Sequence, residues 1–359
     1  MALLVGGETT EAIAALRIAS DLFGERLPVE RCTALNGLGA ALRSAGDPSG
    51  AATAFAAAAE GFEAAGLGAE CAAARFNLGL VQREAGDHAA AVASLRTAAA
   101  ELADLAHAAA AGAAHRELGT TLFQAGDTDA AEIALRRACE LAERAGDMAA
   151  RGAAANVLGL AQLAAGRADE AVATFADAAA SHPRSIRADA HAMAKANLAL
   201  AHEAAGDHVA ARVAARHALA VRAAPEVVGE QASAVLSRVG DEPAAVLALL
   251  DREPPSRWPA MIREEVATWL DAEPARARAE IGAWIRGTLG RAAALELVEA
   301  WLGVLLELPP PDMDRIVAAS WNAVASEDEA QLRRLALRAG ARFHPPQMLR
   351  LEAAFGLRP

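Results

Sequence analysis

The sequence of 359 residues contains no tyrosine, and aromatic residues make up only 4% of it. Alanine, by contrast, fills more than a quarter of the chain. A chain with this composition is a poor former of β-strands and a good former of helices. With 54% hydrophobic residues it is also too apolar for intrinsic disorder. We therefore expect an all-α protein.

Lysine and cysteine are also scarce. Lys195 is the single lysine, and because arginine replaces lysine throughout, we assign this bias no functional meaning. Cys32, Cys71 and Cys139 are an odd number and include no CxxC pair. They are typical of small buried side chains in a reducing compartment.

The net charge and the termini exclude further classes. A formal charge of −12 argues against a protein that binds nucleic acid or an anionic membrane, because either needs a basic surface. The N-terminus lacks the basic region and the apolar length of a signal peptide. Since no stretch reaches the roughly 18 apolar residues of a membrane span, we expect a cytoplasmic protein with no nucleic-acid or membrane partner.

An internal repeat of 40 residues dominates the first two thirds of the chain. Seven residues after each Leu-Gly pair comes a glycine that is followed by aspartate, or by arginine in one copy. Two alanines with a larger residue between them then follow. The glycine suits the end of one helix, the aspartate suits the start of the next, and the small residues let the two helices approach closely. The pairs are Leu38-Gly39, Leu78-Gly79, Leu118-Gly119 and Leu158-Gly159, with Leu198-Ala199 as the fifth copy.

This pattern resembles the tetratricopeptide repeat (TPR). The 40-residue period is similar to that of kinesin light chains and of the sensor arrays in large bacterial transcriptional regulators, so a bacterial origin is expected. The resemblance implies a right-handed superhelix of helical hairpins, a TPR solenoid, in which the first helix of each hairpin lines the concave face. A repeat of this kind buries its apolar face only by stacking on its neighbours.

Four segments are expected along the chain. Residues 1–30 match the second half of a repeat, which is a cap, part of a longer array, or a half completed by another chain. Residues 31–225 form five repeats, and residues 226–253 form a degenerate short one. Residues 254–359 form a helical module that contains all five tryptophans. Its pattern predicts helices over 258–271, 275–289, 291–308, 312–325 and 327–342. The module is a capping bundle or else a dimerisation or ligand-holding module, and a homodimer could form through it or through the N-terminal half-repeat.

The resemblance also implies which side chains line the groove. Asn77 and Asn197 come directly before their leucines, where peptide-binding relatives often carry an asparagine that bridges the N–H and C=O of a peptide. Arg43 and Arg83 predict a basic N-terminal end of the groove. The full set of candidate groove residues is Asn36, Arg43, Phe76, Asn77, Arg83, Arg116, Glu117, Asn156, Asn197 and Glu203.

No pattern in the sequence indicates catalysis. The nine histidines lack cysteine or acidic partners at metal-ligand spacing, and the phosphate-binding loop, GxSxG and HExxH patterns do not occur. We therefore expect no metal, no cofactor and no catalytic residues. The leading hypothesis is a protein–protein interaction adaptor that binds an extended peptide or protein segment in its concave groove. The alternatives are a ligand-sensing regulatory subunit, or an enzyme or enzyme-accessory protein with a pocket between the array and the C-terminal module.

Overall fold

The computed structural model describes residues 2–222 and 224–356. Within these residues every regular element is helical, which confirms the expected all-α solenoid. The chain divides into two compact units, residues 1–182 and residues 183–359. The fifth sequence repeat therefore belongs to the second unit.

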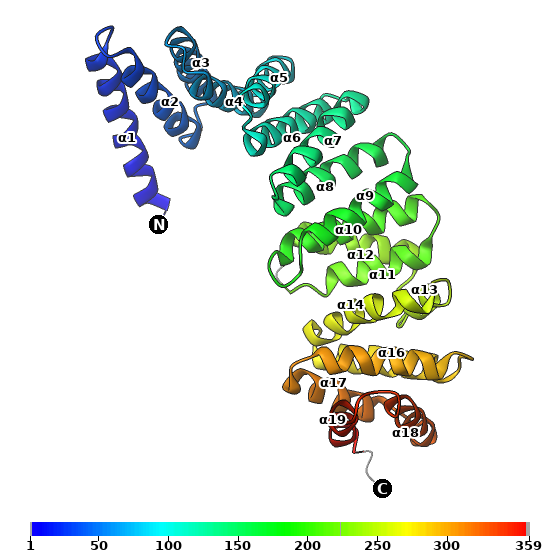
Figure 1. The fold of residues 1–359 in the computed structure, drawn as a ribbon. Coiled ribbons are helices and arrows are strands. Elements are labelled where there is room, and N and C mark those ends of the chain that lie inside the picture. The colour runs from blue at the N-terminus through cyan, green and yellow to red at the C-terminus, as the bar shows by residue number, and fades with distance from the viewer. Residues whose placement is uncertain (1, 223, 357–359) are drawn as a thin grey trace. The chain divides into compact units, whose positions relative to one another are not determined.

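Unit 1 is a stack of helical hairpins in which successive helices lie side by side in chain order (Figure 1). Helices α2 to α8 have 17 residues each, and connections of three residues separate them. The helices are α1 (Ala2–Phe23), α2 (Pro28–Ser44), α3 (Pro48–Ala64), α4 (Gly68–Glu84), α5 (His88–Asp104), α6 (Ala108–Gln124), α7 (Thr128–Arg144), α8 (Met148–Ala164) and α9 (Ala168–Ser181).

The repeat residues hold each hairpin together as expected. Asp87 accepts a hydrogen bond from the backbone N–H of Ala90 at 3.0 Å and so caps α5. Gly79 lies against the fully buried Leu95, and a Cβ added at this glycine would lie 2.6 Å from Leu95 Cγ. Real side chains do not approach so closely, so the small residue is what allows α4 and α5 to pack.

One turn departs from the glycine rule and yields a test. Ala106 has φ +58°, the left-handed conformation that glycine adopts in the neighbouring turns. Ala106→Gly is therefore expected to stabilise unit 1 by up to about 1 kcal/mol, since relief of strain outweighs the greater entropy of the unfolded chain. In urea unfolding, the control Ala125→Gly should destabilise, because Ala125 has φ −77° at the end of α6. A loss of stability in both variants would contradict the strain argument.

Unit 2 begins with repeat-like helices and continues into irregular ones. Four of the five helices predicted after residue 257 are found within two residues at each end, and the fifth begins three residues later than predicted. The elements are α10 (Ala188–Ala204), α11 (His208–Leu219), α12 (Glu226–Val239), α13 (Val246–Leu250), the short 3-10 helix η1 (Pro255–Arg257), α14 (Trp258–Asp271), α15 (Pro274–Leu289), α16 (Ala294–Glu307), α17 (Pro310–Ala323), α18 (Ser326–Gly340) and α19 (Pro345–Phe355).

Tryptophan replaces alanine as the core residue of the irregular part. Trp269 and Trp284 pack edge to face with ring centroids 5.8 Å apart, and Trp301 packs against Phe355 in the same manner. Such pairs add about 0.5–1.5 kcal/mol beyond their buried area. No described helix is both long and apolar enough to cross a membrane.

Candidate functional site

The even-numbered helices form one face of unit 1, which we call the inner face. Helix α2 packs against α4, α4 against α6, and α6 against α8, whereas the odd-numbered helices approach each other less closely. A stack curves toward the side on which its elements lie closest. Eight of the ten candidate groove residues lie on these four helices: Asn36, Arg43, Phe76, Asn77, Arg83, Arg116, Glu117 and Asn156.

The inner face holds a cavity of about 470 Å³ that opens between α4, α6 and α8. Its walls bring together three of the predicted residues, Arg83, Arg116 and Glu117, although they come from different repeats. Further lining residues are Glu84, Thr120, Gln124, Ala153 and Val157. The cavity therefore combines both signs of charge with neutral hydrogen-bonding groups and a small apolar surface.

Ion pairs between successive repeats organise this face. Arg83 Nη1 donates to Glu117 Oε2 at 2.7 Å, and Arg116 Nη2 donates to Glu117 Oε1 at 2.8 Å. One repeat earlier, Arg43 Nε donates to both oxygens of Glu84 at 3.0 Å. The expected basic N-terminal end is thus corrected, because carboxylates neutralise these arginines. Glu84 lies 41 residues after Arg43, which is about one repeat. A carboxylate at this spacing is the feature of the sequence that could have predicted the ion pair.

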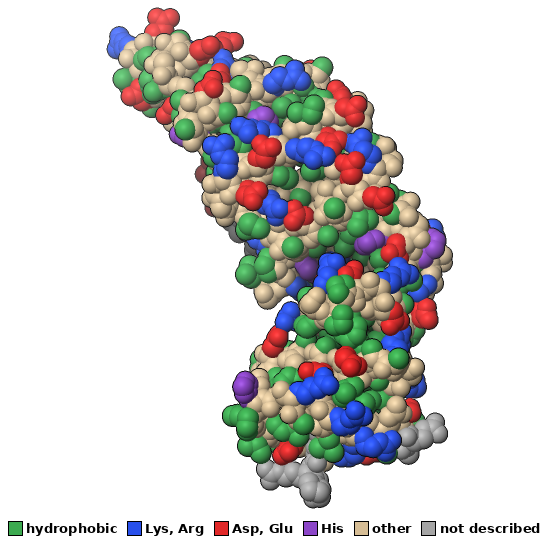
Figure 2. Space-filling view, turned by 45° about the vertical axis from the view of Figure 1, so that its right-hand side comes forward, with side chains coloured by type: hydrophobic (Ala, Val, Ile, Leu, Met, Phe, Trp, Pro, Cys, Tyr) green, Lys and Arg blue, Asp and Glu red, His purple; other side chains and the backbone are tan. Residues whose placement is uncertain are grey.

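The same mixture of charges extends over the surface. On the face shown in Figure 2, acidic and basic side chains lie beside each other in most places, with apolar side chains between them. Ion pairs of unit 1 occur both within a repeat, such as Arg75 with Glu101 and Arg151 with Asp177, and between neighbouring repeats, such as Arg75 with Glu63. Exposed pairs of this kind contribute only about 0–1 kcal/mol each, so they mainly set the electrostatic pattern.

The other candidates on the inner face differ in what they offer. The Oδ1 atom of Asn36 is buried without a hydrogen-bond partner in the described part of the chain. The amide of Asn77 likewise forms no hydrogen bond to a described residue and stays half-buried. Phe76 packs against the core between the second and third repeats, so its ring serves packing. Asn156 is half-buried on α8.

The last two candidates lie in unit 2 and are covered by α12. Asn197 is only 3% exposed, and its Oδ1 accepts a hydrogen bond from Gln231 Nε2 at 2.8 Å. Glu203 accepts two hydrogen bonds from Arg238, which hold the pKa of that carboxyl below its usual range. The expectation that these residues face an open groove is therefore corrected, since a neighbouring helix occupies both.

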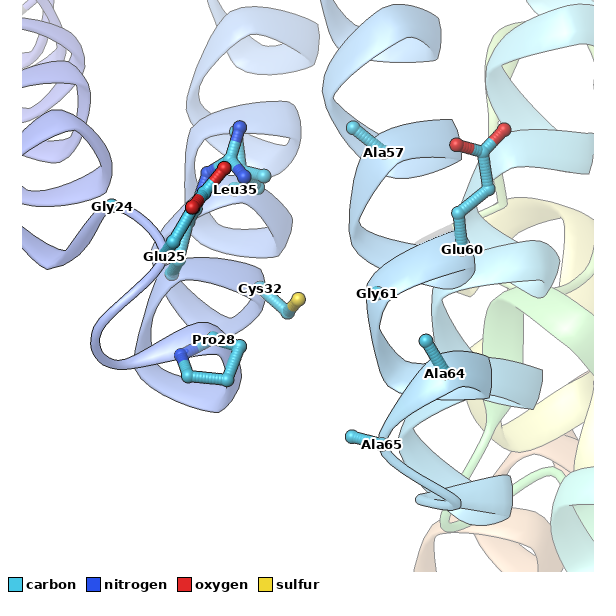
Figure 3. Close-up of a pocket in the computed structure, with 11 residues that line it drawn as sticks. Gly24, Glu25, Pro28, Cys32, Leu35, Ala57, Glu60, Gly61, Ala64 and Ala65 are labelled. Atoms are coloured by element: carbon cyan, nitrogen blue, oxygen red, sulfur yellow. The ribbon is translucent and has the colours of Figure 1, made fainter.

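A second cavity of unit 1, about 600 Å³, lies between the start of α2 and the second half of α3. Figure 3 shows the thiol of Cys32 pointing from α2 toward Gly61 of α3. Because a Cβ at position 61 would collide with Sγ of Cys32, the glycine makes room for this thiol. Burial raises the pKa of the Cys32 thiol, which disfavours the nucleophilic thiolate. The cysteine at this cavity therefore does not indicate a catalytic site.

A buried cluster of charges joins α10, α11 and α14 in unit 2. His217 Nε2 lies 2.9 Å from Glu265 Oε2, and its Nδ1 lies 3.5 Å from Glu264 Oε1. Glu264 also pairs with Lys195, the only lysine, and lies 3.8 Å from His191 Nε2. We call these five residues the buried charge cluster. It fastens the last repeat to the tryptophan-rich helices.

The described residues form neither a metal site nor a reactive cysteine. No group of three or more histidine, cysteine and acidic side chains among them, the buried charge cluster included, is arranged so that it could hold a metal ion. All three cysteines are free thiols, and burial raises the pKa of Cys139 to about 11. A nucleophilic cysteine requires the opposite shift.

Comparisons with known proteins identify some of the helical hairpins of this chain as repeats of a known kind. Two models of the tetratricopeptide repeat match residues 117–144 and residues 158–185, each of which covers the second half of an even-numbered helix and the whole of the following odd-numbered one. These two stretches of the chain are therefore tetratricopeptide repeats. A search of the curated proteins finds no match.

Several solved structures are similar to this chain. BtubC (BKLC) from P. vanneervenii is 15% identical, with a TM-score of 0.48 over 66% of this chain and 94% of that one. The TPR domain of P58(IPK) is 14% identical, with a TM-score of 0.25 over 92% and 98%. A circular tandem repeat protein with novel repeat topology is 12% identical, with a TM-score of 0.34 over 97% and 87%.

Proposed function

We propose that this protein binds an extended segment of another protein along the inner face of unit 1. Tetratricopeptide repeats generally mediate protein–protein interaction, and the cavity between α4, α6 and α8 is the observation that carries the finer proposal. Three successive repeats contribute to its walls. A ligand that contacts all three must extend along the stack, as a peptide does.

The chemistry of the lining suits a peptide better than a simple ion. Glu117 occupies some N–H groups of Arg83 and Arg116, and the others have no partner in the described chain. The amide of Gln124 both donates and accepts, as the backbone of a peptide does. Val157 supplies an apolar contact. The pocket therefore favours a polar or acidic side chain with its flanking backbone amides.

Peptides selected on the full chain from a random display library test this proposal. Their affinity would be measured for wild type, for Arg83→Gln/Arg116→Gln, and for the control Arg136→Gln/Arg137→Gln on α7. Both double variants remove two ion-paired guanidinium groups from unit 1. We expect the inner-face variant to bind about tenfold more weakly or worse, because a hydrogen bond to a charged group contributes about 1.5–3 kcal/mol.

The control variant is expected to keep wild-type affinity within a factor of about two, since substitutions on the surface away from the binding site usually have small effects. Circular dichroism would establish that both variants remain folded. Equal binding by wild type and the inner-face variant would contradict the proposal, as would a loss confined to the α7 variant.

A further inference from the structure

Unit 2 contains a cavity of about 430 Å³ with an apolar interior and a basic rim. It lies between the end of α14, the start of α15 and one side of α17. Trp269, Ile281 and Ile316 underlie it and are at most 2% exposed, whereas Ala318 and Ala319 give it an accessible apolar wall. Arg222, which precedes α12, also lines it. A pocket of this size is within the range that holds small organic ligands.

The arginines of the rim are held in place by the backbone of α14. Arg222 Nε donates to the carbonyl of Asp271 at 2.6 Å, and Arg315 Nη2 donates to the carbonyl of Leu270 at 2.6 Å. These carbonyls end a helix and lack partners within it. Each guanidinium uses one N–H in this way, and its other N–H groups have no partner in the described chain. The backbone therefore fixes both guanidinium groups in place and leaves most of their N–H donors available to a ligand.

A third arginine of the rim has no partner among the described residues. Arg278 on α15 is exposed and forms no hydrogen bond or ion pair with the described residues. Glu273 is the only carboxylate among the lining residues, against three guanidinium groups. In a chain with a net charge of −12, this local excess of positive charge needs a reason. Arginine is the side chain best suited to bind carboxylates.

We propose that this cavity binds a small carboxylate with an apolar body, such as a medium-chain or aromatic acid. The carboxylate lies among Arg222, Arg278 and Arg315, and the apolar body contacts Ala318 and Ala319 of α17, which line the cavity and remain accessible. This site is separate from the inner face of unit 1 and does not depend on peptide binding there. It gives the tryptophan-rich helices a ligand-binding role in addition to their packing.

Isothermal titration calorimetry of the full chain with octanoate tests the proposal. Octan-1-ol is the neutral control ligand, because it has the same apolar body without the charge. The test variant is Arg278→Gln. Arg286→Gln is the matched control, since Arg286 on α15 is also exposed and without a partner among the described residues but lies outside the lining. Ala319→Phe fills the cavity with a larger side chain.

Octanoate is expected to bind wild type and Arg286→Gln equally, and Arg278→Gln about tenfold more weakly, as the loss of a charge-assisted hydrogen bond requires. Octan-1-ol is expected to bind at least about tenfold more weakly than octanoate for the same reason. Ala319→Phe should abolish binding. The proposal is overturned if octanoate does not bind wild type, if the alcohol binds as well as the acid, or if the two arginine variants bind alike.

Discussion

Replacing His217 with alanine is expected to lower the free energy of unfolding of unit 2 by about 3–5 kcal/mol. The ring is only 4% exposed and lies 2.9 Å from the carboxylate of Glu265, which is 5% exposed. Its removal leaves Glu265 as a buried charge without its partner. Desolvation of such a charge costs more than the lost packing.

Two further variants separate this effect from simple truncation. His208→Ala lies on the same helix at an exposed position and is expected to change stability by less than about 0.5 kcal/mol. The double variant His217→Leu/Glu265→Leu removes both charges and should recover most of the loss, because apolar replacements of buried pairs are often neutral. If urea unfolding gives the double variant a free energy of unfolding as low as that of His217→Ala, the charge argument is contradicted.

The same histidine gives the stability of unit 2 a defined pH dependence. Burial lowers the pKa of His217, but the carboxylates of Glu264 and Glu265 raise it more, so the net shift is upward from 6.5. Lys195, His191 and the neighbouring Arg216 are the other charged or titratable groups nearby. A raised pKa means that the folded chain holds the proton more tightly than the unfolded chain.

The stabilisation from His217 is therefore complete below about pH 6.5 and is lost as the pH rises through the folded pKa. Glu264 shows the opposite case. Burial raises its pKa, but His217 and Lys195 lower it well below 4.5, so its contribution is present above that pH and is lost in acid. The difference in stability between wild type and His217→Ala should thus be largest between about pH 4.5 and 6.5. A difference that grows above pH 6.5 would have the wrong sign.

Gly79→Ala is expected to destabilise unit 1 by about 1–3 kcal/mol, although alanine is the better helix former. The new Cβ would lie 2.6 Å from Leu95 Cγ and 3.3 Å from the carbonyl oxygen of Ala91. Leu95 is fully buried and has no space to move. The two helices must therefore separate, which weakens the packing of the whole hairpin.

Gly68→Ala on the same helix is the matched control. A Cβ at Gly68 meets its nearest atom, Leu105 Cδ1, at 3.7 Å, which is an ordinary contact. This variant should therefore change the free energy of unfolding by no more than about 0.5 kcal/mol. Thermal unfolding that shows equal effects of the two substitutions would contradict the role assigned to the glycine of each Leu-Gly pair.

The sequence predicts the repeat hairpins well because each one is specified locally. A positive-φ glycine, a capping aspartate and two small residues fix the hairpin within one repeat. In the irregular part, helix periodicity between prolines is equally informative, and α14 has the predicted bounds. Helix α19 was missed, because it begins with two prolines and only Leu351 and Phe355 anchor it in the core.

Site residues are predicted only where the repeat remains regular. Arg83, Arg116 and Glu117 share one cavity because their helices stack as the period implies. Asn197 has the same position within its repeat as Asn77, yet it is buried, because α12 departs from the repeat and packs on α10. The buried charge cluster was missed for a related reason. Lys195 and Glu264 lie 69 residues apart in the sequence, and no period relates them.

Site-specific photo-crosslinking tests the central claim, that the inner face of unit 1 binds a protein segment. A benzoylphenylalanine would replace Gln124, which lines the inner cavity, or Ala100, which is exposed on α5. Each full-length variant would be irradiated with a display-selected peptide and analysed by mass spectrometry. Binding in the inner cavity predicts crosslinks from position 124 and none from position 100. Crosslinks from position 100 alone, or equally from both, would contradict the claim.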